Sequence, residues 1–286
     1  MDLTAYLDRI GYDKPVEPAE NVLHDLHLAH LLRIPFSTID ALFYPVKPLS
    51  LETVEERLIR QRGGGYCLEH HLLFAEVLRE IGFEVTTLLA KVHNGGPAAR
   101  PTGIPRPHMI LAVRLDGRNW LVDVTFGGGI LWPVPIELGR EFDQHGWKYR
   151  FVLKNGEYYL QTWRVGDWID MYSFTLEPKA FTDLLMLNHF ARTHPDSGLL
   201  SMFWAHRGDL DARWTFWAHW MHGPVRTVLI EYRLDGTMGE HEIDPTDSAD
   251  VLRERFGMHL PDGARLPEKA PDKLAMARAA LDGYGG

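Results

Sequence analysis

The sequence predicts an α+β fold in which helices come first, antiparallel strands follow, and a mixed helical and strand region ends the chain. Residues 1–85 carry apolar side chains at helical spacing, in runs that stop at glycine or proline. The next third of the chain holds runs of β-branched and aromatic residues separated by turn signals. Hydrophobic residues make up 45% of the 286 positions, which is enough for a large core without a disulfide or a structural metal.

Four helices are expected in the first part of the chain, each with a recognisable start or end. Gly11 and Gly82 suit the left-handed conformation that commonly follows a helix. Pro35 stops the second helix, and Ser50 can cap the start of the third. The expected helices are Leu3–Ile10, Leu23–Leu31, Ser50–Ile59 and Cys67–Ile81.

Strands are expected from residue 83 onward, with further helices interspersed near the end of the chain. Asp116-Gly117 separates two strand-like runs and is a strong signal for a tight hairpin. The expected strands are 83–92, 108–115, 120–126, 149–153, 158–164, 169–174, 214–220 and 225–234. The later expected helices are 180–193, 249–256 and 273–281.

Charge and hydropathy exclude several classes of function. The formal net charge of −9 argues against a nucleic-acid partner, because phosphate binding needs clustered lysine and arginine. No stretch approaches the roughly 20 apolar residues that span a bilayer, and the first residues do not resemble a signal peptide. We therefore expect a cytoplasmic protein, either a monomer or a homodimer, with no membrane partner.

The single cysteine, Cys67, follows the glycine run Gly63-Gly64-Gly65 and stands at an expected helix start. One cysteine permits neither an intramolecular disulfide nor a multi-cysteine zinc site. Glycines allow a substrate to approach the backbone closely, and the amides at a helix N-terminus stabilise a thiolate, the reactive form. The alternative is a buried thiol beside a glycine turn. The context favours a nucleophile.

A cysteine nucleophile needs a base and a group that orients the base. His70 and His71 follow Cys67 at spacings of three and four and can approach it on one helix face. Glu69 points another way, so neither histidine has an evident carboxylate partner. We expect both to line the site or to pack rather than to act as the base.

The expected hairpin brings a histidine and an aspartate together. With a two-residue turn Leu115 pairs with Arg118, so continuing the register puts His108 and Asp123 diagonally on one face, about 7–8 Å apart at their Cα atoms. Asp123 lies between two valines, and buried acids are usually paired. A purely structural histidine–aspartate bond is the alternative. Together with the cysteine motif, the pair favours a Cys67–His108–Asp123 triad.

These segments resemble the arylamine N-acetyltransferase family, over about residues 1–200. The matching segments are Tyr6-Leu7-Asp8-Arg9-Ile10-Gly11-Tyr12, Leu26-His27 to His30, Ile34-Pro35-Phe36, Gly64-Gly65-Tyr66-Cys67-Leu68-Glu69, Pro107-His108-Met109, Val122-Asp123-Val124, and Asn188 with His194 to Ser197. Some positions depart from the family pattern: His71 stands where an asparagine is usual, and Thr125 where a glycine is usual. The last third is rich in tryptophan and does not show the family's usual lid pattern.

The resemblance implies a three-part fold with a cysteine-protease-like Cys–His–Asp core. A helical bundle would span residues 1–85 and carry the nucleophile, and a β-barrel would span 86–178 and carry the histidine and aspartate. A connecting helical segment, 179–203, would lead to an α/β lid, 204–286.

The resemblance also implies a ping-pong reaction. Cys67 would take an acetyl group from acetyl-CoA, and an arylamine or arylhydrazine would then attack the thioester, with His108 moving protons and Asp123 orienting it. No permanently bound cofactor and no metal would be needed. The substrate-binding residues implied are Phe36, Tyr66, Phe126, Gly127 and Phe203.

Other functions remain open from the sequence. A relative with the same triad could join a polyketide chain to an aryl amine, in which case the donor would be a larger acyl thioester on an acyl carrier protein. A binding module without activity would have no use for the triad. The histidines at spacing three, His24, His27 and His30, and likewise His219 and His222, are compatible with metal ligation. The resemblance, however, explains the first set as structural, so we expect no catalytic metal.

Overall fold

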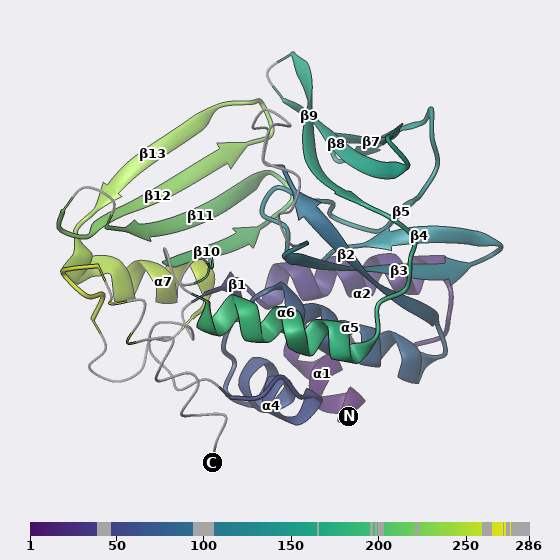
Figure 1. The fold of residues 1–286 in the computed structure, drawn as a ribbon, viewed down its shortest axis with the longest axis horizontal. Coiled ribbons are helices and arrows are strands. Elements are labelled where there is room, and N and C mark those ends of the chain that lie inside the picture. Colours follow the sequence, from purple (N-terminus) through teal and green to yellow (C-terminus); the bar gives the residue numbers. More distant parts are fainter. Residues whose placement is uncertain are drawn as a thin grey trace.

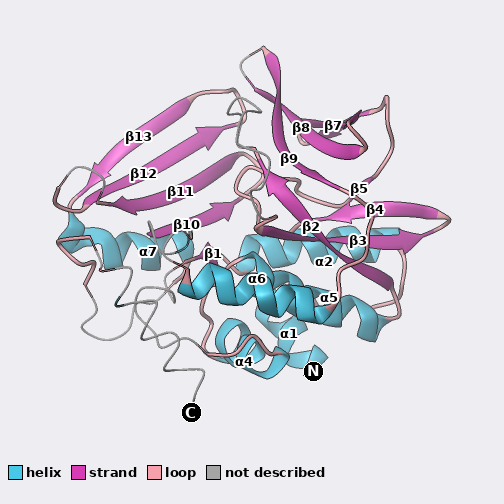
Figure 2. Cartoon of the chain, in the orientation of Figure 1, coloured by secondary structure: helices cyan, strands magenta, loops and turns pink. Residues whose placement is uncertain are grey.

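The computed structural model describes residues 1–38, 47–93, 106–164, 166–194, 197, 199, 203–220, 223–258, 265–270, 272 and 275. Its helices gather beneath two antiparallel sheets (Figures 1 and 2). The order of helices, then strands, then a mixed region confirms the sequence prediction. The expected helix 273–281 falls almost entirely outside the described residues, and the boundaries of the expected domains stay a prediction.

The N-terminal helices begin and end where the sequence predicted. Asp2 caps the first of them, Ser50 caps α4, and Gly11 and Gly82 adopt the left-handed conformation after α1 and α5, with φ of 71° and 107°. A π-helical turn, Glu56–Arg60, extends α4. The helices are α1 (Leu3–Ile10), α2 (Glu20–Arg33), α4 (Leu51–Glu55) and α5 (Cys67–Ile81).

Helix α5 is the centre of the helical part. Eleven of its 15 residues are buried, so the helix is enclosed on nearly all sides. Among them are three polar residues, Glu69, His70 and His71. Buried polar groups are costly unless they are hydrogen-bonded, so these three side chains require partners from neighbouring elements.

The larger sheet is barrel-like and has eight strands in the order β5-β4-β3-β2-β9-β8-β7-β6. An isolated bridge between Leu138 and Phe151 also brings the segment before β6 against β7. Apolar side chains fill its interior, including Tyr149, Phe151 and Tyr172. The strands are β2 (Glu84–Val92), β3 (His108–Leu115), β4 (Arg118–Val122), β5 (Val134–Pro135), β6 (Glu141–Gln144), β7 (Trp147–Lys154), β8 (Glu157–Arg164) and β9 (Asp167–Phe174).

The second sheet has the order β1-β10-β11-β12-β13, and α7 packs against it (Figure 1). Its edge strand β1 comes from the N-terminal part, since Phe36 pairs with His206 of β10 and also bridges to Gly65. Helix α6 leads from the larger sheet to the second sheet. The elements are β1 (Phe36–Ser37), α6 (Phe181–Thr193), β10 (Phe203–Gly208), β11 (Ala212–His219), β12 (Arg226–Arg233), β13 (Met238–Ile243), a 3-10 turn (Pro245–Asp247) and α7 (Ser248–Phe256).

The sequence analysis missed several short or polar strands. Strands β1 and β5 have two residues each, too few to show any periodicity, and β13 is mostly polar and exposed. No strand was expected where β10 lies, and its first residue, Phe203, fell in the expected connecting segment 179–203. Among the described residues, none of the helices combines the length and apolar character needed to cross a membrane.

The hairpin that joins β3 and β4 has the predicted register, with Leu115 paired to Arg118 and Leu111 to Val122. Asp116 and Gly117 both have positive φ, 49° and 75°, as a type I′ turn requires.

We expect Gly117→Ala to lower the free energy of unfolding by about 1 kcal/mol, because a Cβ disfavours this backbone conformation. The space around Gly117 is open, so the loss comes from the backbone alone. Urea unfolding measures the change. Gly117→Asn is the matched control and should lose less, since asparagine tolerates positive φ; equal losses for the two variants would contradict this explanation.

Candidate active site

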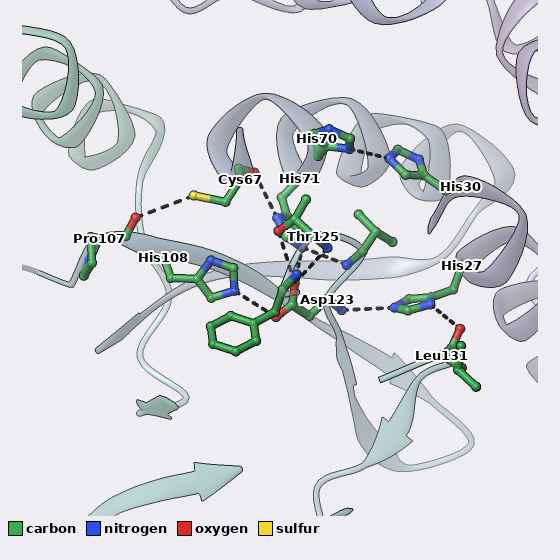
Figure 3. Close-up of polar contacts among 12 residues, drawn as sticks. His27, His30, Cys67, His70, His71, Pro107, His108, Asp123, Thr125 and Leu131 are labelled. Carbon is green, nitrogen blue, oxygen red and sulfur yellow. Dashed lines mark hydrogen bonds and ion pairs between the residues drawn. The ribbon is translucent and has the colours of Figure 1, made fainter. Parts of the chain in front are cut away.

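Cys67 is the first residue of α5 and is buried. Its sulfur lies 3.6 Å from the carbonyl oxygen of Pro107, the residue before His108 (Figure 3). The glycine run before it is required by close packing. A Cβ on Gly64 would lie 2.7 Å from the carbonyl oxygen of Pro35, so only glycine lets this segment pass directly against the chain that leads into β1.

The start of α5 is held by side chains on three elements. The backbone N–H of Tyr66 donates to Glu69 Oε2 at 3.1 Å, which caps the helix. Arg57, in the π-helical turn, forms an ion pair with the same carboxylate. The hydroxyl of Tyr66 donates to Asn188 Oδ1 of α6. These contacts fix the position of the backbone from which the Cys67 side chain projects.

His108 and Asp123 are in direct contact. His108 Nε2 lies 2.8 Å from Asp123 Oδ2 (Figure 3), and the carboxylate is fully buried. The other carboxylate oxygen accepts the backbone N–H groups of Thr125 and Phe126, at 3.1 and 3.2 Å, and the hydroxyl of Thr125 at 3.3 Å. The carboxylate therefore makes hydrogen bonds with both oxygens, as a buried charge requires.

The charge of Asp123 decides the protonation of His108. Burial alone would lower the pKa of His108, but the charge of Asp123 and hydrogen bonds to Asp123 and Cys67 outweigh it and raise that pKa. Burial likewise opposes the ionised form of Asp123, yet the charge of His108 and its hydrogen bond hold the pKa of Asp123 well below its ordinary value. The pair is an imidazolium with a carboxylate, and the neighbouring Cys67 also favours the charged imidazole. Such an arrangement can stabilise a thiolate.

Two further histidines bind the segment that carries Asp123. His27 Nε2 accepts the backbone N–H of Asp123 at 3.2 Å, and His71 Nε2 accepts that of Val124 at 3.3 Å. The sequence analysis placed His71 beside the site, as its spacing from Cys67 indicated, but it identified no partner for it. It missed His27 entirely as a site residue, because no local pattern connects residues 27 and 123.

His70 has a different role from its neighbour. Its Nδ1 lies 2.9 Å from His30 Nε2, and His30 Nδ1 lies 2.9 Å from the hydroxyl of Tyr6. All three side chains are fully buried. His70 therefore packs between helices, as expected, and does not reach the carboxylate.

Aromatic rings surround the His108 imidazole. Phe126 lies edge-on to His108 with ring centroids 5.3 Å apart, and Tyr172 is 5.0 Å from Phe126. Gly127 follows, and a Cβ there would lie 2.6 Å from Nδ1 of His206 on β10. The second sheet therefore packs directly against the loop after Asp123.

The structure brings three of the five expected substrate-binding residues together. Phe36, Phe126 and Gly127 line a common cavity of about 20 Å³. Tyr66 and Phe203, among the described residues, do not line it. Tyr66 instead binds Asn188, and Phe203 is fully buried against Phe216 in the core of the second sheet. Their expected part in substrate binding stays a prediction.

Within the described part of the chain, no group of three or more histidine, cysteine or acidic side chains is arranged to hold a metal ion. Of the helical histidines, His24 contacts Trp120 edge-on, while His27 and His30 form the hydrogen bonds described above. His222 lies outside the described residues.

Comparisons with known proteins show one family. A family profile described as N-acetyltransferase matches residues 21–265. Arylamine N-acetyltransferase from Mycobacterium tuberculosis is 33% identical over 266 residues, which cover 92% of this chain and 91% of the relative. Arylamine N-acetyltransferase 1 from Homo sapiens is 32% identical over 286 residues, which cover 91% of this chain and 95% of the relative.

Solved structures of the same family resemble this chain over nearly its whole length. The arylamine N-acetyltransferase of M. smegmatis matches with a TM-score of 0.83 at 32% identity and covers 99% of each chain. That of Mycobacterium marinum in complex with CoA matches with a TM-score of 0.82 at 32% identity and covers 98% of this chain and 99% of the other. These likenesses confirm the expected fold class.

The buried histidines other than His108 make stability depend on pH. Burial lowers the pKa of His27 and His206 to about 4 and the pKa of His70 to about 3. Burial also holds the pKa of His30 well below its ordinary value. In the unfolded chain these groups take up protons near pH 6.5, so their contribution is complete above that pH and is lost as the pH falls toward about 4. The loss is on the order of 1.4 kcal/mol per pH unit for each histidine.

Urea unfolding at about pH 7.5 and about pH 5 should therefore show a clear loss of stability at the lower pH. His108 acts in the opposite direction: its raised pKa keeps it protonated in the folded protein, so its contribution is complete below about pH 6.5 and is partly lost as the pH rises to about 7.5. It offsets part of the loss caused by the four neutral histidines and does not reverse it. His30→Asn should show a smaller difference between the two pH values, because one of the titrating groups is gone. A stability that is constant between the two pH values would show that these histidines are not held neutral.

Proposed function

The chain belongs to the arylamine N-acetyltransferase family, and we propose that it moves an acetyl group from acetyl-CoA to the nitrogen of an arylamine through a thioester on Cys67. The observation that carries this proposal is the buried contact of His108 with Asp123 at 2.8 Å, with the Cys67 sulfur 3.6 Å from the carbonyl oxygen of Pro107, the residue before His108. These residues supply the nucleophile, the base and the orienting acid that acyl transfer requires. Family members use acetyl-CoA, and the M. marinum relative binds CoA.

In the first half-reaction the Cys67 thiol proton resides on His108 and the thiolate attacks the carbonyl carbon of acetyl-CoA. The new sulfur–carbon bond forms, and the bond to the CoA sulfur breaks. The CoA sulfur leaves with the proton from His108. Because Nε2 of His108 is bound to Asp123, the proton moves through the remaining ring nitrogen, Nδ1.

In the second half-reaction the arylamine nitrogen attacks the carbonyl carbon of the thioester. His108 accepts a proton from the amine, and the bond between the carbonyl carbon and the Cys67 sulfur breaks. Cys67 leaves as a thiolate, and the proton stays on His108, which restores the starting pair. Asp123 stabilises the imidazolium in both halves without taking the proton itself.

The position of the aromatic rings supports an arylamine as the acceptor. Phe126 lies against the His108 ring, and Phe36 lines the same cavity. Flat apolar rings bind an aromatic ring well by edge and offset contacts. Because Phe126 contacts the His108 ring directly, an acceptor ring packed on Phe126 would hold its amine near His108.

Incubation with acetyl-CoA alone should give one acetyl group on Cys67, detected by mass spectrometry of the intact protein and of its peptides. Addition of an arylamine should remove it and release the N-acetyl product. Cys67→Ser should take up no acetyl group while keeping its thermal stability. Transfer by the Cys67→Ser protein would contradict the mechanism, and an adduct formed only from larger, carrier-bound acyl thioesters would indicate amide synthesis instead.

Asp123→Asn should lower the rate of acetyl transfer by about 10⁴-fold, the scale seen when the acid of a catalytic triad becomes an amide. The neutral side chain can no longer stabilise the imidazolium form of His108. Single-turnover kinetics measure the change. Asp170→Asn is the control, since Asp170 is a carboxylate of the same sheet that binds Lys154 at 2.8 Å; equal losses in the two variants would contradict the assigned role.

A further inference from the structure

The segment that carries Asp123 lies beyond the strand that leads to it. The β3–β4 ladder ends at the pair Leu111–Val122, and the β4–β5 ladder ends at Leu121–Val134. Asp123 comes one residue later, where strand pairing no longer fixes the backbone. Its carboxylate nevertheless lies 2.8 Å from His108, so other contacts must hold this segment.

Four successive backbone N–H groups in this segment donate to side chains. Those of Asp123 and Val124 donate to the Nε2 atoms of His27 and His71, at 3.2 and 3.3 Å. Those of residues 125 and 126 donate to the carboxylate of Asp123 itself. The two histidines come from α2 and α5, so they bind the segment from two separate helices (Figure 3).

The second ring nitrogen of each histidine settles the tautomer. Nδ1 of His27 lies 2.9 Å from the carbonyl oxygen of Leu131, and Nδ1 of His71 lies 2.9 Å from that of Cys67. A carbonyl oxygen accepts only, so Nδ1 carries the proton in both rings and Nε2 is free to accept an N–H.

One contact bears on whether His71 is charged. His71 Nε2 also lies 3.4 Å from Asp123 Oδ1. A charge-assisted N–H···O bond to a carboxylate is shorter, about 2.7–2.9 Å. The 3.4 Å contact is longer than such a bond, and the lone pair of Nε2 is already the acceptor for the N–H of Val124. Burial, which lowers the pKa of His27 to about 4, keeps that ring neutral as well.

We propose that His27 and His71 form an imidazole clamp, a pair of neutral rings that replaces strand pairing after Val122 and aims Asp123 at His108. Both are positioning residues, since neither touches the reacting atoms. His71 has an additional effect, because it joins the carbonyl group of Cys67 to the segment that carries the acid. The inference rests on the proposed roles of Cys67, His108 and Asp123.

The tautomers can be tested in the unaltered protein. Nitrogen-15 NMR of protein labelled at its histidine rings separates a protonated Nε2 from an unprotonated one. The resonances are assigned by their loss in His27→Gln and His71→Gln. An unprotonated Nε2 and a protonated Nδ1 in both rings is the expected result, and a protonated Nε2 in either ring overturns the proposal.

Substitutions test the positioning itself. The amide oxygen of glutamine can take the place of Nε2 and accept a backbone N–H, whereas leucine cannot. His71→Leu and His27→Leu should therefore slow both alkylation of Cys67 by iodoacetamide and acetyl transfer by at least about tenfold, since misplacement by an ångström costs up to 10²-fold. In the glutamine variants both rates should stay within about threefold of those of the unaltered protein, because the backbone N–H keeps an acceptor.

His30→Leu is the matched control. His30 lies on α2 with His27, is equally buried, and binds Tyr6 and His70 instead of the Asp123 segment. This variant should lose thermal stability and keep the alkylation rate of Cys67. Equal rates for leucine and glutamine variants, or rates that follow thermal stability across all variants including His30→Leu, overturn the proposal.

The two proposals fail in different ways. Absence of an acetyl group on Cys67, with the expected tautomers and alkylation rates, overturns the acyl-transfer mechanism and leaves the clamp intact. An acetyl group on Cys67 together with a protonated Nε2 in either ring overturns the clamp and leaves the acyl-transfer mechanism intact. Where a leucine variant does not fold, the NMR result and the glutamine variants still decide.

Discussion

The buried negative charge of Asp123 is the constraint on which the arrangement of this site depends. An unpaired carboxylate in the protein interior is strongly unfavourable, so a fold that buries one must surround it with donors. Here His108 supplies one donor, and the backbone and hydroxyl groups of the next residues supply the rest. Those donors bend the chain directly after β4 and so determine where Phe126 and the loop beyond it lie. The cavity that this loop lines therefore depends on how the charge of Asp123 is hydrogen-bonded.

The same interior shifts the pKa of its histidines in opposite directions, and the hydrogen bond of His108 to this carboxylate makes the difference. Burial removes the water that would stabilise an imidazolium, which lowers the pKa of His27, His30 and His70. His108 is just as enclosed, but its direct contact with the carboxylate outweighs the loss of water and raises its pKa. Of these four rings only His108 is therefore charged. Neutral rings are useful elsewhere because a neutral imidazole can accept one hydrogen bond and donate another.

Local rules explain which parts of the site could be predicted from sequence. The two-residue turn predicted the register of the β3–β4 hairpin, and the glycine run and helix start singled out Cys67. The strand expected over 120–126 ends at Val122, so Asp123 meets His108 although strand pairing stops before it. The contacts of His27 and His71 with the Asp123 segment join residues 96 and 53 positions apart, and neither follows any local period. Strand β1 was missed for a related reason: two residues cannot show alternation, and its pairing with β10 spans most of the chain. Tertiary packing, rather than local preference, fixes these elements.

The reacting groups and the walls of the neighbouring cavity come from different parts of the fold. Cys67, His108 and Asp123 come from α5 and from the β3–β4 hairpin, which pack together in the helical and barrel-like parts. The cavity beside them is closed by the second sheet, since His206 of β10 packs on Gly127 and pairs with Phe36. Phe36 also bridges to Gly65, two residues before Cys67. A change in how the second sheet packs would therefore alter the shape offered to a substrate. It would also reach the start of α5 through the two backbone hydrogen bonds that join Gly65 to Ser37 and Pro35, at 2.7 and 3.4 Å. Phe36 and His206, which reach the cavity from the second sheet, are not among the donors to Asp123. This side of the cavity can therefore change its shape for different acceptors while the reacting groups keep their places.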